Sequence, residues 1–299
     1  MDNVTSRADA SGAFSWCPTC PLCDAASLPA FMAADYRMYR CTGCRTAFVN
    51  PVPGPEELAA FYSRFHRGCD KGGWYDDVET RMQADFPAKV QLVKRFLGRQ
   101  PARVLDVGCG KGFFVKACCD SGIAAEGIDP ADSGVRYATE CLHVKATCGP
   151  LADQKDRLGQ FDAITCWATI EHLADPRGLA RDIYALLRPG GYLFMDTGHG
   201  DDWLEHLLPG QTQWYDPPQH LFVFSDRGLR LLLESERFKV VRFDGCFERS
   251  AVRRSLRIVR NGAFAVGVRM IYAMSRIGRG TFLFTRFAVG NTMIFVAQK

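Results

Sequence analysis

The chain has few of the sequence features that direct a protein across or into a membrane. Its first ten residues contain no basic start followed by an apolar run, so a secretory signal is not expected. The apolar run 287–297 is far shorter than the roughly 20 residues that a membrane-spanning helix needs. Thirteen cysteines without a signal peptide favour metal binding and packing over disulfide bonds. We therefore expect a cytoplasmic protein.

Acidic residues are absent from residues 249–299, which hold nine arginines and Lys299. This stretch carries a charge of +10, and because the whole chain carries +4, the first 248 residues carry −6. Four arginines recur at helical spacing with apolar residues between them: Arg249, Arg253, Arg257 and Arg260. Residues 249–286 are therefore predicted to form a basic amphipathic helical insertion. Such an insertion can contact an anionic membrane at the inner face or an acidic substrate, or it can be a packing or dimerisation helix.

The most specific motif, residues 104–112, lacks parts that two common nucleotide sites require. It reads Val-Leu-Asp-Val-Gly-Cys-Gly-Lys-Gly and is followed by a helix-compatible stretch. A dinucleotide fingerprint needs glycine where Phe113 stands, and a phosphate-binding loop needs Ser or Thr directly after Lys111. What remains is a strand, a glycine turn and a helix, with Asp106 just before the turn. A carboxylate there would repel a pyrophosphate but suits a ligand with an ammonium group or hydroxyls.

Three further segments follow this motif in order. Residues 124–128 form a predicted strand that ends at Asp129, 23 residues after Asp106. A carboxylate at that position can accept hydrogen bonds from ribose hydroxyls. Residues 161–167 form another predicted strand, and residues 186–197 combine a helix end, a Pro-Gly-Gly turn and a strand.

Together these four segments, over about residues 100–245, resemble class I S-adenosylmethionine-dependent methyltransferases. The resemblance implies a doubly wound, seven-stranded, Rossmann-like α/β sheet and S-adenosylmethionine as the cofactor. It assigns cofactor binding to the glycine turn and the strand ends: Asp106, Gly108, Cys109, Gly110, Gly112, Asp129, Pro130 and Trp167. One departure is Gly198-His199, where related chains tend to have Pro-Asn.

Five cysteines lie close together near the start of the chain: Cys17, Cys20, Cys23, Cys41 and Cys44. The last four form two CxxC pairs separated by 17 residues, a spacing typical of a four-thiolate zinc ribbon. Another register would use Cys17 and Cys20 as the first pair. We prefer the later pair because the residue after it needs a positive φ, which Asp24 tolerates and Pro21 cannot reach. Residues 15–50 are thus predicted to be a zinc ribbon with ligands Cys20, Cys23, Cys41 and Cys44.

The ribbon is followed by two predicted helices. Pro55 is well placed as a first helical residue, and a second helical stretch is expected from about Asp76 to Leu97, interrupted near Pro87. Residues 51–99 would then be a linker that covers the cofactor site, or helices that simply pack on the sheet.

The methyltransferase domain itself is predicted over residues 100–248 and 287–299. Its sixth and seventh strands are expected at 238–243 and 292–297, which normally form an almost direct hairpin. Here the basic insertion separates them.

Methyl transfer is an in-line displacement, so such an enzyme mainly positions the acceptor. An oxygen acceptor usually needs a base with a pKa near neutrality. His220, in the loop after the fifth strand, and His172, just beyond the fourth, are the catalytic candidates, and a structural role is the alternative for each. The segment 216–219, Asp-Pro-Pro-Gln, lacks the aromatic fourth residue of the amino-group methyltransferase motif, which favours an oxygen acceptor over a nucleobase amine.

The ribbon and the segment 48–58 after it resemble a bacterial subgroup of these enzymes with an N-terminal zinc-binding domain. Many members of the subgroup modify sugars, lipid-linked intermediates or natural products, so a small-molecule acceptor is expected. One alternative is an RNA methyltransferase that grips phosphates with the ribbon and the insertion. Nucleic acid is disfavoured because the basic residues lie in one amphipathic insertion. The other alternative, a non-catalytic cofactor-binding regulator, is disfavoured by the intact Asp106, glycine run and Asp129.

Overall fold

The computed structural model of the chain describes residues 14–15, 17–69, 83–98, 102–203, 205, 210–245 and 292–299, with positions 259, 263 and 266. The basic helix expected at 249–286 therefore lies outside the described residues, apart from those three positions, and so does the start of the helix expected from Asp76. No helix within the described parts of the chain combines the length and apolarity that crossing a bilayer requires.

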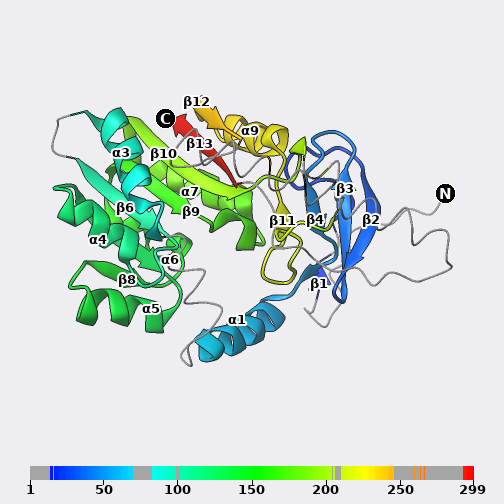
Figure 1. Cartoon of the computed structure of the whole chain (residues 1–299), viewed down its shortest axis with the longest axis horizontal. Coiled ribbons are helices and arrows are strands. Elements are labelled where there is room, and N and C mark those ends of the chain that lie inside the picture. The colour runs from blue at the N-terminus through cyan, green and yellow to red at the C-terminus, as the bar shows by residue number, and fades with distance from the viewer. Residues whose placement is uncertain are drawn as a thin grey trace.

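A seven-stranded sheet forms the centre of the molecule (Figure 1). Its spatial order is β12-β13-β10-β9-β6-β7-β8. The strand bounds are β6 (Arg103–Val107), β7 (Ala124–Asp129), β8 (Ala146–Cys148), β9 (Phe161–Trp167), β10 (Leu187–Gly198), β12 (Lys239–Asp244) and β13 (Thr292–Gln298). Strands β6 to β10 are parallel, whereas β13 runs antiparallel to both β10 and β12. The predicted doubly wound sheet is confirmed, and the carboxyl ends of its parallel strands share one edge.

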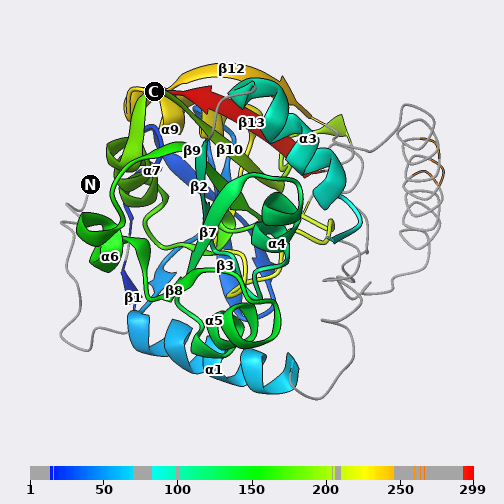
Figure 2. The same cartoon turned by 90° about the vertical axis from the view of Figure 1, so that its left-hand side faces the viewer.

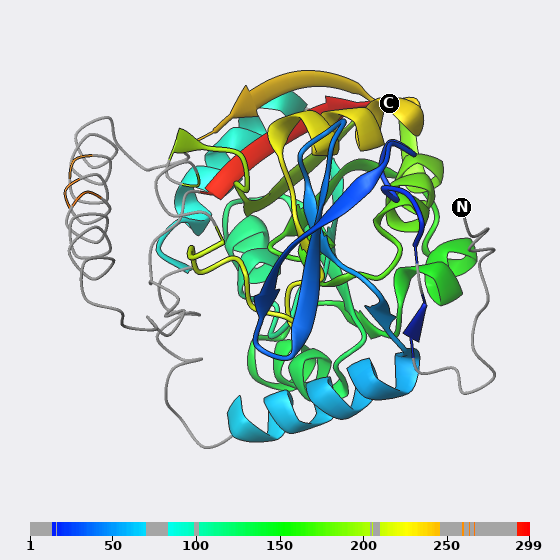
Figure 3. The ribbon, with the colours of Figure 1, turned by 90° about the vertical axis from the view of Figure 1, so that its right-hand side faces the viewer.

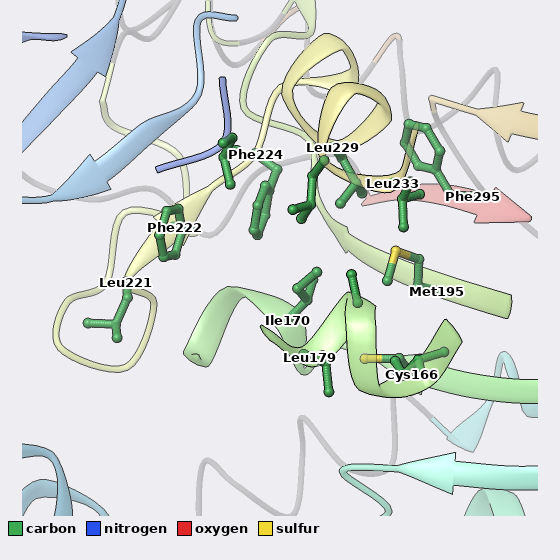
Figure 4. Packing of buried hydrophobic residues seen from close by; sticks show 14 of the residues in the cluster. Cys166, Ile170, Leu179, Met195, Leu221, Phe222, Phe224, Leu229, Leu233 and Phe295 are labelled. Atoms are coloured by element: carbon green, nitrogen blue, oxygen red, sulfur yellow. The ribbon is translucent and has the colours of Figure 1, made fainter. Parts of the chain in front are cut away.

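Helices cover both faces of this sheet, and the strand residues alternate between them. Val104 and Phe194 pack in one buried cluster with α3 (Phe86–Leu97) and α4 (Phe113–Asp120). Leu105 and Met195 pack in the opposite cluster with α7 (Pro176–Leu186) and α9 (Asp226–Ser235), which lie on the other side of the sheet from α3 and α4 (Figure 2). Figure 4 shows the second packing, in which leucines of α9 lie against Met195 and Phe295. The shorter helices are α5 (Asp132–Arg136), η1 (Tyr137–Cys141), α6 (Leu151–Leu158) and η2 (Ile170–His172).

The N-terminal ribbon shares a sheet with a distant part of the chain. Strands β2 (Ser27–Ala33), β3 (Tyr36–Cys41) and β4 (Ala47–Val49) are antiparallel, and β11 (Phe222–Val223) adds to β4 as a fourth strand. In Figure 3 these strands lie in front of the large sheet, and α1 (Pro55–Cys69) runs along one side. A small pair, β1 (Phe14–Ser15) with β5 (Val52–Pro53), precedes α1. The ribbon is thus joined to the methyltransferase domain by backbone pairing.

Prolines mark two expected features of the helices and one difference in a strand. Pro55 begins α1 as predicted, and Pro87 lies in the first turn of α3, after a helical residue at 83 and a turn at 84–85, so the interruption expected near Pro87 is present. A first helical turn tolerates proline because its N–H groups have no intrahelical partner. The expected turn at Pro189 is part of β10, where four residues between Leu187 and Tyr192 oppose one residue of β9. Proline is found in strands at such irregular positions because it cannot donate to the ladder.

Candidate cofactor and acceptor site

The glycine turn lies between β6 and α4 and needs glycine for two reasons. Gly108, Gly110 and Gly112 have φ values of 76°, 51° and 78°, a left-handed region that favours glycine. A Cβ on Gly108 would lie 2.3 Å from Thr169 Oγ1, and one on Gly112 would lie 2.7 Å from Ala138 Cβ. The backbone of the turn is therefore packed closely against the loop after β9 and against η1. Whether these glycines approach a cofactor stays a prediction.

Asp129 is oriented by the same turn, which β7 brings alongside β6. Its Oδ2 accepts a hydrogen bond from the Gly110 N–H at 2.9 Å, and its Oδ1 accepts one from the Ala131 N–H at 2.8 Å. A carboxylate has about four acceptor positions, and these two hydrogen bonds use two of them. The predicted role of Asp129 is compatible with this geometry.

Asp106 lies beneath the turn, where it is 3% exposed. Burial raises the pKa of this carboxyl to about 7. The hydrogen bond of 2.6 Å that Thr165 Oγ1 donates to it acts in the opposite direction and lowers the pKa. Such a group carries at most a partial negative charge at neutral pH, and a nearby cation would favour its ionisation. The binding role of Asp106 stays a prediction.

The other cofactor candidates lie around the turn. Cys109 is buried so closely against β7 that a Cβ on Gly127 would lie 2.5 Å from its sulfur. Pro130 follows Asp129, and its carbonyl accepts a contact of 3.8 Å from the Cys148 thiol. Both positions border the turn, and their binding roles stay predictions.

Trp167 ends β9 and packs into the α3 and α4 side of the sheet. Its ring centroid lies 5.4 Å from that of Phe114 in an edge-on arrangement, and the Lys89 ammonium lies 4.5 Å from the Trp167 ring. The indole is 5% exposed, and its Nε1 has no hydrogen-bond partner among the described residues. Trp167 is thus a packed core residue at the end of β9, and its assigned contact with a cofactor stays a prediction. Sequence reasoning gave no role to Lys89, because a lysine in an amphipathic helix normally faces water.

The two histidine candidates meet beyond the ends of β9 and β10. Glu171, His172 and His220 each offer an oxygen or nitrogen ligand atom, and these atoms lie within 4.8 Å of one another. The two imidazole rings have centroids 4.9 Å apart. His172 Nδ1 lies 2.6 Å from the Gln219 carbonyl oxygen, and His220 Nδ1 lies 2.9 Å from that of Trp214. Because a carbonyl only accepts, each Nδ1 carries the hydrogen and each neutral ring keeps a lone pair on Nε2.

Burial sets the protonation of this group. It lowers the pKa of His172, so that this ring is neutral at neutral pH. It also raises the pKa of Glu171 to about 8, although the Thr197 hydroxyl opposes the shift. The site therefore combines a neutral imidazole, which can accept a proton, with a carboxyl that is largely protonated at neutral pH.

Tyr62 is a neighbour of this group that sequence reasoning missed. Its hydroxyl lies 3.4 Å from the Gln219 carbonyl oxygen, which also receives His172. Burial, with the negative charge of Glu171, raises the pKa of Tyr62 to about 12. The only sequence signal was the apolar face of the helix that begins at Pro55, which also suits ordinary packing.

The unusual Gly198-His199 pair has a packing explanation. A Cβ on Gly198 would lie 2.3 Å from the Trp214 ring, so the indole occupies the space of a side chain. His199 Nδ1 lies 3.0 Å from the Gly245 carbonyl, and its ring packs against Phe243. The loop after β10 is therefore shaped around Trp214, whose carbonyl also holds His220.

The predicted cysteine ligands come together in the ribbon. The sulfurs of Cys20, Cys23, Cys41 and Cys44 lie within 4.8 Å of one another, with Cys20–Cys44 at 3.7 Å and Cys23–Cys41 at 3.5 Å. Asp24 has a φ of 59°, as the preferred register requires. Backbone N–H groups of Leu22, Gly43 and Cys44 point at the sulfurs, as expected for thiolates. Cys17 is not a member of this cluster. The donor set fits tetrahedral Zn²⁺.

The ribbon reaches the histidine pair through backbone hydrogen bonds. The Val49 N–H of β4 donates to the Leu221 carbonyl at 2.9 Å, and the Leu221 N–H donates to the Glu171 carbonyl at 2.8 Å. Figure 1 shows β11 between the ribbon strands and the large sheet. Leu221, which directly follows His220 in the chain, thus links the ribbon to η2.

Comparisons with known proteins show the family and the fold. The sequence profile of the family described as "Methyltransferase domain" matches residues 79–242, more than half of the chain. The chain is 31% identical over 165 residues to the ubiquinone biosynthesis O-methyltransferase of Bordetella avium (strain 197N), a match that covers 48% of this chain and 68% of that relative. It is also 31% identical over 179 residues to the ubiquinone biosynthesis O-methyltransferase of Xanthomonas axonopodis pv. citri (strain 306), covering 53% of this chain and 72% of that relative.

A solved structure supports the fold. The crystal structure of a SAM dependent methyltransferase from Archaeoglobus fulgidus superposes with a TM-score of 0.51 at 17% identity, covering 76% of this chain and 100% of that chain. The likeness at this identity concerns the fold alone, whereas the profile and the two relatives concern the family. The chain therefore belongs to the methyltransferase domain family and is a class I S-adenosylmethionine-dependent methyltransferase.

Proposed function

We propose that this methyltransferase transfers a methyl group to a hydroxyl oxygen of a small-molecule acceptor, a sugar, a lipid-linked intermediate or a natural product. The observation that carries the proposal is the pair of imidazoles, His172 and His220, 4.9 Å apart at the carboxyl edge of the sheet. The printed names of the relatives, ubiquinone biosynthesis O-methyltransferases, support oxygen as the acceptor atom.

In this proposal the glycine turn and Asp129 hold S-adenosylmethionine, which supplies a methyl group on a positively charged sulfur. Gly108, Gly110 and Gly112 let the backbone approach the cofactor, and Asp129 accepts hydrogen bonds from its ribose. Asp106 contributes negative charge beneath the turn. Cys109, Pro130 and Trp167 would complete the walls.

His220 would act as the base. Its Nδ1 lies 2.9 Å from the Trp214 carbonyl, so in this proposal Nε2 is the ring atom that accepts the proton of the acceptor hydroxyl. As that proton passes to Nε2, the acceptor oxygen bonds to the methyl carbon and the carbon–sulfur bond breaks. His172, kept neutral by burial, is the second candidate and would orient the acceptor or share its proton.

The ribbon and the insertion have supporting roles in this proposal. Cys20, Cys23, Cys41 and Cys44 would hold a structural Zn²⁺ ion that fixes β4 and, through it, β11. Residues 249–286 would contact an anionic membrane surface or an acidic substrate. The enzyme would then be cytoplasmic and peripheral to the inner face of the membrane.

Methyl transfer from labelled S-adenosylmethionine to a panel of hydroxylated acceptors, sugar nucleotides and phenols among them, tests the proposal. We expect turnover of at least one acceptor, and His220→Asn should lower kcat by about 100-fold or more, as for loss of a general base. The control is His143→Asn, an exposed left-handed position that asparagine tolerates. Full activity of His220→Asn, or cofactor binding without transfer to any acceptor, would contradict it.

A further inference from the structure

Lys89 is a charged residue at a core position of α3. It shares the buried face of that helix with Val90, Leu92 and Val93, and only 4% of its surface is exposed. A buried ammonium group loses its hydration, so an apolar residue of similar size is often at least as stable in such a place. Stability alone therefore does not explain the charge.

The Lys89 ammonium joins two strands that border the site. Its Nζ lies 2.6 Å from Asp196 Oδ2 on β10, with both side chains almost fully buried. The same Nζ lies 4.5 Å from the centroid of the Trp167 ring at the end of β9, an arrangement with cation–π attraction. Asp196 and Trp167 are paired in the register of the sheet. One ammonium group thus contacts both members of the last β9–β10 pair.

Asp196 in turn holds the backbone that leaves β9. Its Oδ1 accepts a hydrogen bond of 2.8 Å from the Ala168 N–H. Ala168 has a φ of 46°, a left-handed conformation that is unfavourable for a residue with a Cβ and persists only where its surroundings hold it. The Ala168 N–H also reaches the Asp196 backbone carbonyl at 3.2 Å, so the carboxylate supplies the shorter of two restraints, and Lys89 fixes the carboxylate.

The turn that begins at Ala168 connects the two halves of the site. Thr169 Oγ1 occupies the space beside Gly108, so the turn rests on the glycine turn. The same hydroxyl donates to the Trp167 carbonyl at 3.0 Å. Glu171 and His172 follow directly in η2. A displacement of residues 168–172 would therefore disturb both the cofactor side and the acceptor side.

We propose that Lys89 is a positioning residue: its ammonium group holds Asp196 and the Trp167 ring and thereby fixes the turn 168–172 between the glycine turn and the histidine pair. The inference rests on the cofactor placement proposed above and adds a residue from outside the predicted site.

The charge of Lys89 also affects two buried carboxyls. It favours ionisation of Asp106 and Glu171, whereas burial and the neighbouring Asp196 oppose it. At Asp106, the charge of Asp129 also opposes ionisation, whereas the hydrogen bond from Thr165 favours it. At Glu171, the neighbouring titratable group is Tyr62. Removal of Lys89 should therefore raise the pKa of Asp106 above about 7. If the cationic cofactor binds better when Asp106 is ionised, the affinity of the variant for the cofactor should rise with pH. The midpoint of this rise should lie at a higher pH than in the wild type.

The test compares the wild type with Lys89→Met, which keeps the length of the side chain, and with the double variant Lys89→Met/Asp196→Asn. Lys94→Met, a neighbouring lysine of α3 outside this set of contacts, is the matched control. Three quantities are measured: hydrogen–deuterium exchange of residues 167–172, affinity for S-adenosylmethionine by calorimetry between pH 6 and 9, and Tm.

Lys89→Met should exchange faster in residues 167–172 and bind S-adenosylmethionine about 10-fold more weakly, with the pH midpoint moved upward. The double variant should recover Tm, because no buried carboxylate is left uncompensated, but not the affinity or the exchange protection. Lys94→Met should match the wild type.

Two results would overturn the inference. One is a Lys89→Met protein with wild-type exchange and affinity, and the other is a double variant that regains affinity together with Tm, which would show a purely structural role. If the wild type binds no S-adenosylmethionine, the proposed function is wrong, and exchange in residues 167–172 alone decides the role of Lys89.

Discussion

Gly198 and Trp214 form a pair in which one residue is small because the other is large. The φ angle of Gly198 lies outside the left-handed region, so the requirement is for space and not for backbone freedom. Gly198→Ala should lower the free energy of unfolding by about 1–3 kcal/mol, as other overpacked cores do. Chemical denaturation measures this change.

A double-mutant cycle separates this steric cause from others. Gly198→Ala should be tolerated better in a Trp214→Leu background, where the ring is gone, than in the wild type. The same cycle with the exposed Trp203→Leu should be additive. Additivity in the Trp214 cycle would show that the two residues do not compete for space.

Glu171 gives the folded state a specific pH dependence. Burial raises its pKa from 4.5 to about 8, so the fold disfavours the ionised form. Below the unfolded pKa both states are protonated and nothing is lost, whereas stability falls as pH rises from 4.5 to about 8. Between pH 6 and pH 9 this group alone should remove about 2–3 kcal/mol from the free energy of unfolding.

The Glu171→Gln variant tests this dependence by urea denaturation at the two pH values. Its loss of stability between pH 6 and pH 9 should be smaller than that of the wild type by about the same 2–3 kcal/mol. Glu140→Gln, at an exposed position, is the control and should behave like the wild type. An unchanged pH dependence in Glu171→Gln would mean that this carboxyl is not the titrating group.

At the scale of elements, the ribbon and the acceptor loop depend on each other through β4 and β11. If the four thiolates hold zinc, Cys23→Ser should lower metal content and speed exchange in residues 221–225, because β11 pairs only with β4 in its described sheet. Affinity for S-adenosylmethionine should stay within about threefold, since the glycine turn lies on the other side of β9. Cys119→Ser, an exposed thiol, is the control. Unchanged exchange in a metal-depleted variant would contradict this coupling.

Local sequence patterns predicted most of these elements. The strand at 161–167 was predicted with the bounds that β9 has. The register of the ribbon followed from the φ that Asp24 adopts. The irregular start of β10 and the two-residue β11 were not predictable, since both exist only through pairing with strands far away in the sequence.

The candidate site could be predicted only where a single segment carries the signal. The glycine turn and the paired cysteines are such segments. Tyr62 and Lys89 are not, because each looks like an ordinary helical residue until the fold brings it to Gln219 or Asp196. The proximity of His172 and His220 likewise depends on the loop after β10, whose path is set by Trp214 and the ribbon.

At the scale of the whole molecule, the last strand closes the large sheet. Residues 293–297 of β13 are all buried, and the strand pairs on both sides, with β10 and β12. Removal of residues 292–299 should abolish the cooperative thermal transition, because four large core side chains at about 1.5–3 kcal/mol each rival the total stability of a domain. Removal of residues 298–299 alone keeps these side chains and should retain the transition. A cooperative transition in the longer deletion would show that β12 can pair without β13.

The pairing of β4 with β11 has a consequence for how the chain folds and evolves. The ribbon's sheet cannot be completed until residue 223 has left the ribosome, some 170 residues after β4. The sheet of the cysteine-bearing segment therefore stays incomplete until β11 of the other domain is available. A contact between residues so far apart in the sequence slows folding. For the same reason, the ribbon cannot be exchanged between such enzymes as an independent cassette unless the loop that ends at β11 is exchanged with it.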